Sequence, residues 1–197
     1  MRGKRHKCGL KLFVLAAAQP SYVLAFDMKT EAHNLALEGV FEGTKVVMNL
    51  LRRAKLLNTR RSVCTDNYYT SLELMQALRR AGMYGFGVLR KTRAPRPVRM
   101  AERSHPRGTW KETVHRDTQT VCTAWQDNRV VYFLSNCSNT GGAARVTRGL
   151  RGVGDVEVPC LEVVHDYNVG MGPIDQVQCV AMWTASTAAS QMTTACA

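Results

Sequence analysis

The order of helix and strand patterns in the first half of this chain constrains its fold more than any other feature. Apolar residues recur at helical spacing from Val46 to Leu57, and a short strand pattern follows at 61–66. A second helix is predicted from an N-cap at Ser71 to a stop at Gly82, and a second strand from Tyr84 to Leu89. Helices and strands that alternate in this way require parallel crossovers, so the sequence predicts an α/β sheet.

Strand patterns flank this unit on both sides. Gly9–Ala18 and Tyr22–Phe26 are predicted to form an antiparallel hairpin across the turn at Gln19–Ser21. Further along, apolar strand patterns occur around 110–114, 121–125 and 130–135, and a turn at Asp127-Asn128 predicts that the last two form a hairpin. We expect a Gly-rich loop over 136–154 and an apolar segment over 156–164.

Basic residues dominate the middle of the chain. The 197 residues carry a net charge of +12, and the stretch from Arg52 to Arg107 holds fourteen Lys and Arg against three acids. A strongly basic protein is expected to bind a polyanion, with nucleic acid ahead of a membrane surface. Within this stretch, 90–107 is rich in Pro and Arg without periodicity and is predicted to be an exposed loop. The candidate DNA-binding residues on it are Arg90, Lys91, Arg93, Arg96 and Arg99.

Cysteine usage and hydropathy exclude several other classes of protein. The seven cysteines are scattered, and none forms the Cys-x-x-Cys pair of a zinc or redox site. This pattern favours free thiols in a reducing compartment over a disulfide framework. The longest apolar run, Leu10–Ala18, contains Lys11 and is too short to span a membrane, so neither secretion nor membrane insertion is expected.

Three groups of residues are candidate sites. Asp66 follows a strand and precedes a capped helix, and Asp175 follows Gly172-Pro173 at the predicted start of another helix. Carboxylates in such places hold divalent metals, but taken singly each is better explained as a turn residue or a helix-dipole partner. The third group, His105 and His115 with Cys122, fits no metal-ligand spacing and is interpreted as surface histidines.

The two acidic motifs together resemble those of a known family. Asp-Asn-Tyr-Tyr-Thr-Ser at 66–71 is followed by Tyr-Asn-x-x-x-Gly-x-x-Asp at 167–175, as in the catalytic domain of piggyBac-type transposases. Segments 7–12, 87–93 and 125–135 resemble further motifs of this family in the same order. The resemblance extends from about Lys7 to Gln176.

This resemblance implies an RNase H-like (retroviral integrase-like) fold, in which a mixed sheet is flanked by helices and a β-rich insertion covers about 108–164. The partial catalytic domain is expected over 1–178, followed by a low-complexity tail over 179–197. By its motif, Asp66 corresponds to the second catalytic aspartate of the family and Asp175 to the third. The family uses such aspartates to hold Mg²⁺ for cut-and-paste DNA transposition.

Departures from the family pattern predict a catalytically incomplete domain. The strand with the first family aspartate would precede Lys7, and Asp27 does not match its motif. Gln178 stands where the family has a further acid. With so few carboxylates, Mg²⁺ is expected to bind weakly or not at all. The resemblance therefore implies a transposable element-derived nuclear protein that retains at most non-specific DNA binding.

Two alternatives remain open. The chain could be a basic, non-enzymatic nucleic-acid-binding protein whose acids are structural, or an active transposase whose gene model is truncated. The missing strand would normally lie between Gly9–Ala18 and Arg61–Thr65. Without it we expect either that these two strands pair directly or that the domain is marginally stable and self-associates through an open strand edge.

Overall fold

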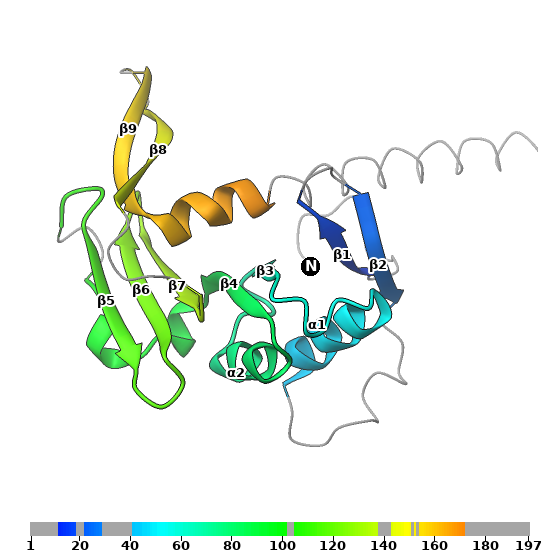
Figure 1. Ribbon diagram of the computed structural model, residues 1–197. Helices are drawn as coiled ribbons and strands as arrows, with labels where there is room; N and C mark the ends of the chain where they lie inside the picture. Colours follow the sequence, from blue (N-terminus) through cyan, green and yellow to red (C-terminus); the bar gives the residue numbers. More distant parts are fainter. Residues whose placement is uncertain are drawn as a thin grey trace, which may run out of the picture.

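A five-stranded mixed sheet with helices packed against it forms the centre of the molecule (Figure 1). The computed structural model describes residues 12–18, 22–28, 41–101, 105–137, 143–150, 152 and 154–171. In this sheet the strand order is β3-β4-β7-β6-β5. The strands are β3 (Ser62–Thr65), β4 (Tyr84–Leu89), β5 (Trp110–His115), β6 (Thr120–Gln126) and β7 (Val130–Ser135).

The predicted crossover unit is confirmed. β3 and β4 pair in parallel, and α2 (Leu72–Arg80) connects them. Ser71 caps this helix, since its hydroxyl oxygen accepts a hydrogen bond of 3.1 Å from the backbone N–H of Leu74. Gly82 then turns the chain with a φ of +62°, a conformation that glycine adopts without strain.

The predicted N-terminal hairpin is also confirmed, as a separate two-stranded sheet. β1 (Leu12–Ala17) and β2 (Tyr22–Met28) pair antiparallel, with an irregularity between Leu15 and Ala16. One face of the hairpin packs on α1 (Glu42–Arg53), and Phe13 is completely buried there. Among the described residues β1 does not pair with β3, so the direct pairing considered above is not observed.

Three antiparallel strands extend the central sheet and confirm the strand patterns near 110–135. β5 pairs with β6, β6 with β7, and β7 with β4. Every residue of β6 is buried. The core on one side of these strands includes Trp125, Phe133 and Val158, and on the other Tyr132, Leu134 and Val98.

The segment after residue 136 corrects the prediction of a loop. A second hairpin forms from β8 (Ala143–Leu150) and β9 (Gly154–Leu161). β8 lies in the predicted loop because glycines and arginines weaken its apolar alternation, whereas β9 overlaps the apolar segment predicted over 156–164. Tertiary contacts stabilise the hairpin: Asp127 accepts hydrogen bonds from Arg107 and Arg148, and Trp125 donates its indole N–H to the carbonyl oxygen of Pro159.

The chain turns directly from β9 into a helix over 162–171, which the sequence interpretation did not predict. Figure 1 shows this helix, coloured orange, running from the end of β9 towards the β1–β2 hairpin. Val163 and Val164 are buried against the central sheet. None of the helices in the described ranges is long and apolar enough to cross a membrane.

The basic segment after β4 is more ordered than the predicted exposed loop. It contains two short 3₁₀ turns, Lys91–Arg93 and Arg96–Val98. Ala94, Val98 and Met100 are buried in the core, while most of the charged residues between them are exposed. The segment therefore lies on the surface and is anchored by its buried apolar residues.

Candidate nucleic-acid interface

Asp66 lies directly after β3, at the carboxyl end of a strand in the central sheet. Its Oδ1 accepts a hydrogen bond of 2.8 Å from the backbone N–H of Tyr68, and its carbonyl accepts one of 2.7 Å from the hydroxyl of Thr70. This is the Asx turn that an Asp-Asn sequence favours. Within the described residues the other carboxylate oxygen, Oδ2, has no hydrogen-bond partner, so half of the carboxylate is available for a ligand.

The strands around Asp66 are packed so tightly that only small residues fit. A Cβ on Gly87 of β4 would lie 2.1 Å from the carbonyl oxygen of Thr65. A Cβ on Gly170 would lie 3.0 Å from that of Cys64. The helix over 162–171 therefore crosses β3 within two residues of Asp66.

Two aromatic side chains follow Asp66 and pack edge-on. The ring centroids of Tyr68 and Tyr69 are 5.0 Å apart, and the hydroxyl of Tyr68 donates a hydrogen bond to Glu42 of α1. Burial, together with this bond and the charge of Glu42, raises the pKa of Tyr68 to about 12. Burial and the neighbouring Asp66 also raise the pKa of Tyr69, so both phenols stay neutral at physiological pH.

Arg90 and Arg93 extend the aromatic group, but they are held differently. Arg93 donates a hydrogen bond of 2.8 Å to the carbonyl of Thr70, and its guanidinium lies 4.4 Å from the ring centroid of Phe41. Burial and the nearby Arg90 lower the pKa of Arg93. Arg90 lies 5.8 Å from the ring of Tyr68 and is exposed. Within the described residues the Arg90 guanidinium makes no ion pair or hydrogen bond, so it can bind an anion.

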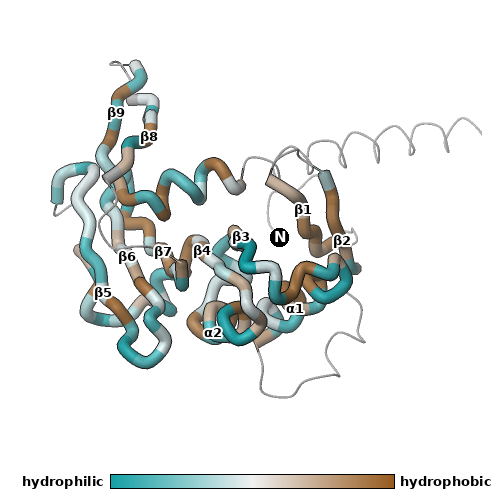
Figure 2. The backbone as a smooth tube through the Cα atoms, in the orientation of Figure 1, coloured by the Kyte–Doolittle hydropathy of each residue, from teal (hydrophilic) through white to brown (hydrophobic). Residues whose placement is uncertain are grey.

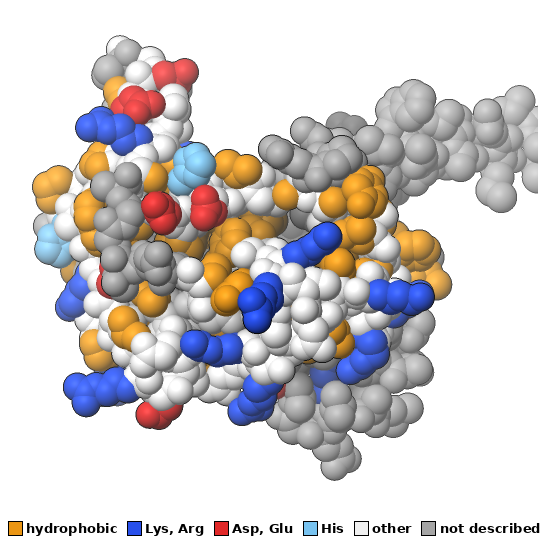
Figure 3. Space-filling model, in the orientation of Figure 1, with side chains coloured by type: hydrophobic (Ala, Val, Ile, Leu, Met, Phe, Trp, Pro, Cys, Tyr) orange, Lys and Arg blue, Asp and Glu red, His pale blue; other side chains and the backbone are white. Residues whose placement is uncertain are grey.

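The other predicted DNA-binding residues are all exposed. Arg99 is exposed but donates a hydrogen bond of 2.9 Å to the carbonyl of Ala94, which stabilises the second 3₁₀ turn. Lys91 and Arg96 are exposed. Figure 3 shows Lys and Arg side chains over the α1–α2 part of the molecule, whereas acidic side chains gather near β9 and the helix that follows.

Of the two predicted metal-binding acids, Asp66 lies within the described residues and Asp175 does not. Asp175 and Gln178 lie outside the described residues, as does the predicted tail at 179–197. No group of three His, Cys, Asp or Glu side chains that could hold a metal occurs in the described ranges. Asp27 does not join Asp66, because its carboxylate contacts Asn49 and Arg53 of α1.

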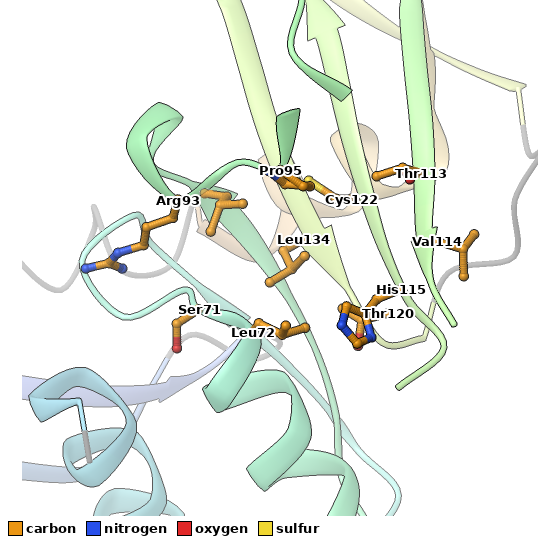
Figure 4. Close-up of a pocket in the computed structure, with 11 residues that line it drawn as sticks. Ser71, Leu72, Arg93, Pro95, Thr113, Val114, His115, Thr120, Cys122 and Leu134 are labelled. Atoms are coloured by element: carbon orange, nitrogen blue, oxygen red, sulfur yellow. The ribbon is translucent and has the colours of Figure 1, made fainter. Parts of the chain in front are cut away.

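A cavity of about 360 Å³ lies between the start of α2, the basic segment and the β5–β6 strands (Figure 4). His115 and Cys122, which the sequence grouped with His105, are both in its lining, together with Leu72, Leu134 and the stem of Arg93. Its walls come from distant segments, so no local sequence pattern indicated it. His115 and His105 are exposed, and Cys122 is buried.

Comparison with known proteins identifies the family. The family described as Transposase IS4 matches residues 1–195. This chain belongs to that transposase family. No curated protein matches the chain.

A solved structure supports the same fold. The piggyBac transposase in a synaptic complex with hairpin DNA, determined by cryo-electron microscopy, superimposes with a TM-score of 0.71. Sequence identity is 20%, and the match covers 92% of this chain but 36% of that one. The chain thus shares the mixed α/β architecture of that transposase over about a third of its length. The expected resemblance to piggyBac-type transposases is confirmed.

Proposed function

We propose that this chain is a transposase-derived domain of RNase H-like fold that binds DNA without sequence preference and does not cleave it. The family match and the architecture support a transposase origin. The observation that carries DNA binding is the exposed Arg90 guanidinium beside Tyr68, two residues from Asp66. An arginine in this position can contact a phosphate while the aromatic ring limits its freedom.

The carboxylates support the absence of cleavage. Mg²⁺ needs several oxygen ligands in near-octahedral geometry, usually including more than one carboxylate. In the described ranges Asp66 supplies one carboxylate, and Asp27 is occupied by α1. These residues alone do not make a two-metal site, so we derive no metal-dependent step. Asp175 remains the proposed second ligand, and Gln178 is a neutral replacement at the further acidic position.

A second candidate function is a basic nucleic-acid-binding protein in which Asp66 has a purely structural role. The Asx turn favours it, because the Asp66 carboxylate already organises the loop that starts α2. The two candidates differ in whether Asp66 has any metal-dependent effect. For both of them we propose a nuclear location.

DNA binding is tested by fluorescence anisotropy on a labelled duplex at several salt concentrations. Arg90→Ala with Arg96→Ala should weaken binding about tenfold and reduce the slope of log affinity against log salt, because fewer counterions are released. The matched control is Arg116→Ala with Arg129→Ala, which removes the same charge from two exposed turns elsewhere. Equal losses in both double variants would mean that net charge, not this surface, binds DNA. An affinity that does not change with salt would refute the proposal.

Cleavage is tested by nicking of supercoiled DNA with Mg²⁺ or Mn²⁺. We expect no metal-dependent nicking by the chain or by its Asp66→Asn variant. Nicking that requires metal and disappears in the variant would identify an active transposase domain instead. DNA binding that strengthens with Mg²⁺ only when Asp66 is present would favour the first candidate, a transposase-derived domain. It would disfavour the second, in which Asp66 has a purely structural role.

A further inference from the structure

The cavity of about 360 Å³ lies on one face of the central sheet, which two separate elements cover. α2 packs on β4 and β7, and the 3₁₀ turn Arg96–Val98 packs on β5 and β6. Thr113, Cys122 and Leu134 are direct partners on three neighbouring strands, so their side chains share this face. The sheet therefore supplies one rigid wall of the cavity, and the start of α2 and the segment around Pro95 supply the others (Figure 4).

Neither Arg93 nor Cys122 places a charge in the cavity, although both line it. The guanidinium of Arg93 is held by the carbonyl of Thr70 and the ring of Phe41, so only its aliphatic stem is left for the cavity. Figure 4 shows this guanidinium pointing away from Cys122. Burial raises the pKa of Cys122 to about 12, so its thiol is neutral at physiological pH. A charged ligand would lose its hydration without gaining an ion pair from these groups, so the cavity favours an uncharged one.

Hydrogen-bonding groups line the part of the cavity that β5 forms. The hydroxyl of Thr113 makes no hydrogen bond within the described residues. His115 uses its Nδ1 in a hydrogen bond of 3.1 Å with the hydroxyl of Thr118, and in the described ranges its Nε2 has no partner. These two groups can bind one hydroxyl or N–H of a ligand, while Leu72 and Leu134 contact its apolar part.

We propose that this cavity binds an uncharged bicyclic aromatic molecule that carries one hydroxyl or N–H group. Its volume of about 360 Å³ is near the lower end of the range for ligand pockets, ~300–1,000 Å³, and accommodates one small molecule. A planar ring is favoured over a flexible chain because it loses little conformational freedom on binding. The sulfur of Cys122 and the imidazole of His115 also make favourable contacts with aromatic rings. Arg90 is not in the lining, so this inference does not depend on DNA binding.

The test titrates the full chain with 2-naphthol, and naphthalene-2-sulfonate serves as a control with the same ring and a negative charge. Calorimetry measures affinity, and amide chemical shifts in NMR spectra locate the probe. We expect 2-naphthol to bind and to shift the amides of Thr113, Cys122 and Leu134, and the sulfonate to bind at least about tenfold more weakly. Absence of 2-naphthol binding would overturn the proposal. Equal or tighter binding of the sulfonate would overturn it too, because the basic surface would then be the site.

Variants of β5 test the position of the ligand. Thr113→Trp places an indole in the cavity and should weaken 2-naphthol binding at least about tenfold. The matched control is Lys111→Trp on the same strand, which is exposed and outside the lining and should leave the affinity unchanged. Unchanged affinity in Thr113→Trp would overturn the proposal.

Thr113→Val tests the polar end of the cavity without adding volume. Because valine has nearly the shape of threonine, this variant removes the hydroxyl alone and should weaken 2-naphthol binding about three- to tenfold. The result does not depend on whether the larger tryptophan is tolerated. Affinity that stays the same in Thr113→Val would overturn the class of ligand proposed.

DNA shows whether the cavity is a site of its own. A saturating amount of duplex should leave the affinity for 2-naphthol unchanged, because the exposed Arg90 lies outside the cavity lining. Competition between duplex and 2-naphthol would mean that the cavity belongs to the DNA-binding surface, and it would overturn the proposal of a small-molecule site.

Discussion

The central sheet and the β1–β2 hairpin bury their apolar side chains to very different extents. In the sheet, Trp125 and Tyr132 are 1% and 2% exposed and are covered by distant segments. In the hairpin, one face packs on α1, but Tyr22 and Phe26 are 52% and 57% exposed. Figure 2 shows apolar residues, coloured brown, along both regions. Apolar character alone therefore does not ensure burial, and the number of packed layers makes the difference.

This difference indicates that the central sheet contributes more to the free energy of unfolding than the β1–β2 hairpin does. β6 has paired strands on both sides and side chains packed on both faces. β1 has one described neighbouring strand and one covered face. Since stability follows buried apolar area, the sheet should unfold last and the hairpin first.

The largest expected effect is the removal of the most buried aromatic side chain of the sheet. Trp125→Ala should lower the free energy of unfolding by about 3–5 kcal/mol, because it leaves a cavity and removes the hydrogen bond to Pro159. The same truncation in the hairpin, Phe26→Ala, should cost less than about 1 kcal/mol. Urea unfolding followed by circular dichroism measures both. Similar losses in the two variants would break the comparison.

A smaller effect is expected where the β8–β9 hairpin attaches to the sheet. Asp127 is the shared acceptor of Arg107 and Arg148, whose side chains are largely buried. Asp127→Asn should destabilise by about 1–3 kcal/mol and speed hydrogen exchange in β8 and β9 before the rest of the sheet. The exposed Asp155→Asn is the control and should change stability by less than about 0.5 kcal/mol. Uniform acceleration of exchange across the whole sheet would show that the hairpin is not a separate unit.

The N-terminal cap of α2, the helix between β3 and β4, provides a local test of stability. Ser71→Ala removes the side-chain oxygen that caps α2 and should cost about 1 kcal/mol. Ser62→Ala, at an exposed position on β3, removes the same hydroxyl without a cap. Thermal melts of the two variants should differ by several degrees. If both melt like the unchanged chain, the cap contributes nothing.

The smallest effect near neutral pH concerns the buried thiols. Burial raises the pKa of Cys122 to about 12, from an ordinary value of 9.0, whereas Cys137 is exposed. The unfolded chain thus loses the Cys122 proton at lower pH than the folded one. Its contribution to stability is complete below about pH 9 and is lost as the pH rises towards 12. Cys122→Ala should make this decline shallower.

Alkylation gives an independent measure of the same difference. At pH 8 iodoacetamide should modify Cys137 quickly and Cys122 only on unfolding, as read by peptide mass spectrometry. Rapid modification of Cys122 in the folded chain would show that the sheet opens more often than its burial implies.

Local sequence patterns determined those parts of the fold that depend on neighbouring residues. The β1–β2 hairpin and the Ser71 cap were predicted because turn residues and capping oxygens act over a few positions. The strands from 110 to 135 were predicted because their apolar residues cluster in short runs bounded by turns. For the same reason the turn at Asp66 could be predicted as the start of α2, although its carboxylate geometry could not.

Tertiary structure decided the rest. β8 became a strand because Arg148 and Asp127 join it to a distant turn, which no local periodicity records. Arg93 was grouped with the exposed basic residues, yet it is anchored to Thr70 and Phe41 because the chain folds back on the Asp66 loop. Which arginines remain available for an anion therefore depends on long-range packing. The sequence by itself determined that this chain is a basic α/β protein with transposase motifs, since charge and short-range pattern are written along the chain. Only the three-dimensional arrangement decided which guanidinium groups remain available, because their contacts come from neighbours far away in the sequence.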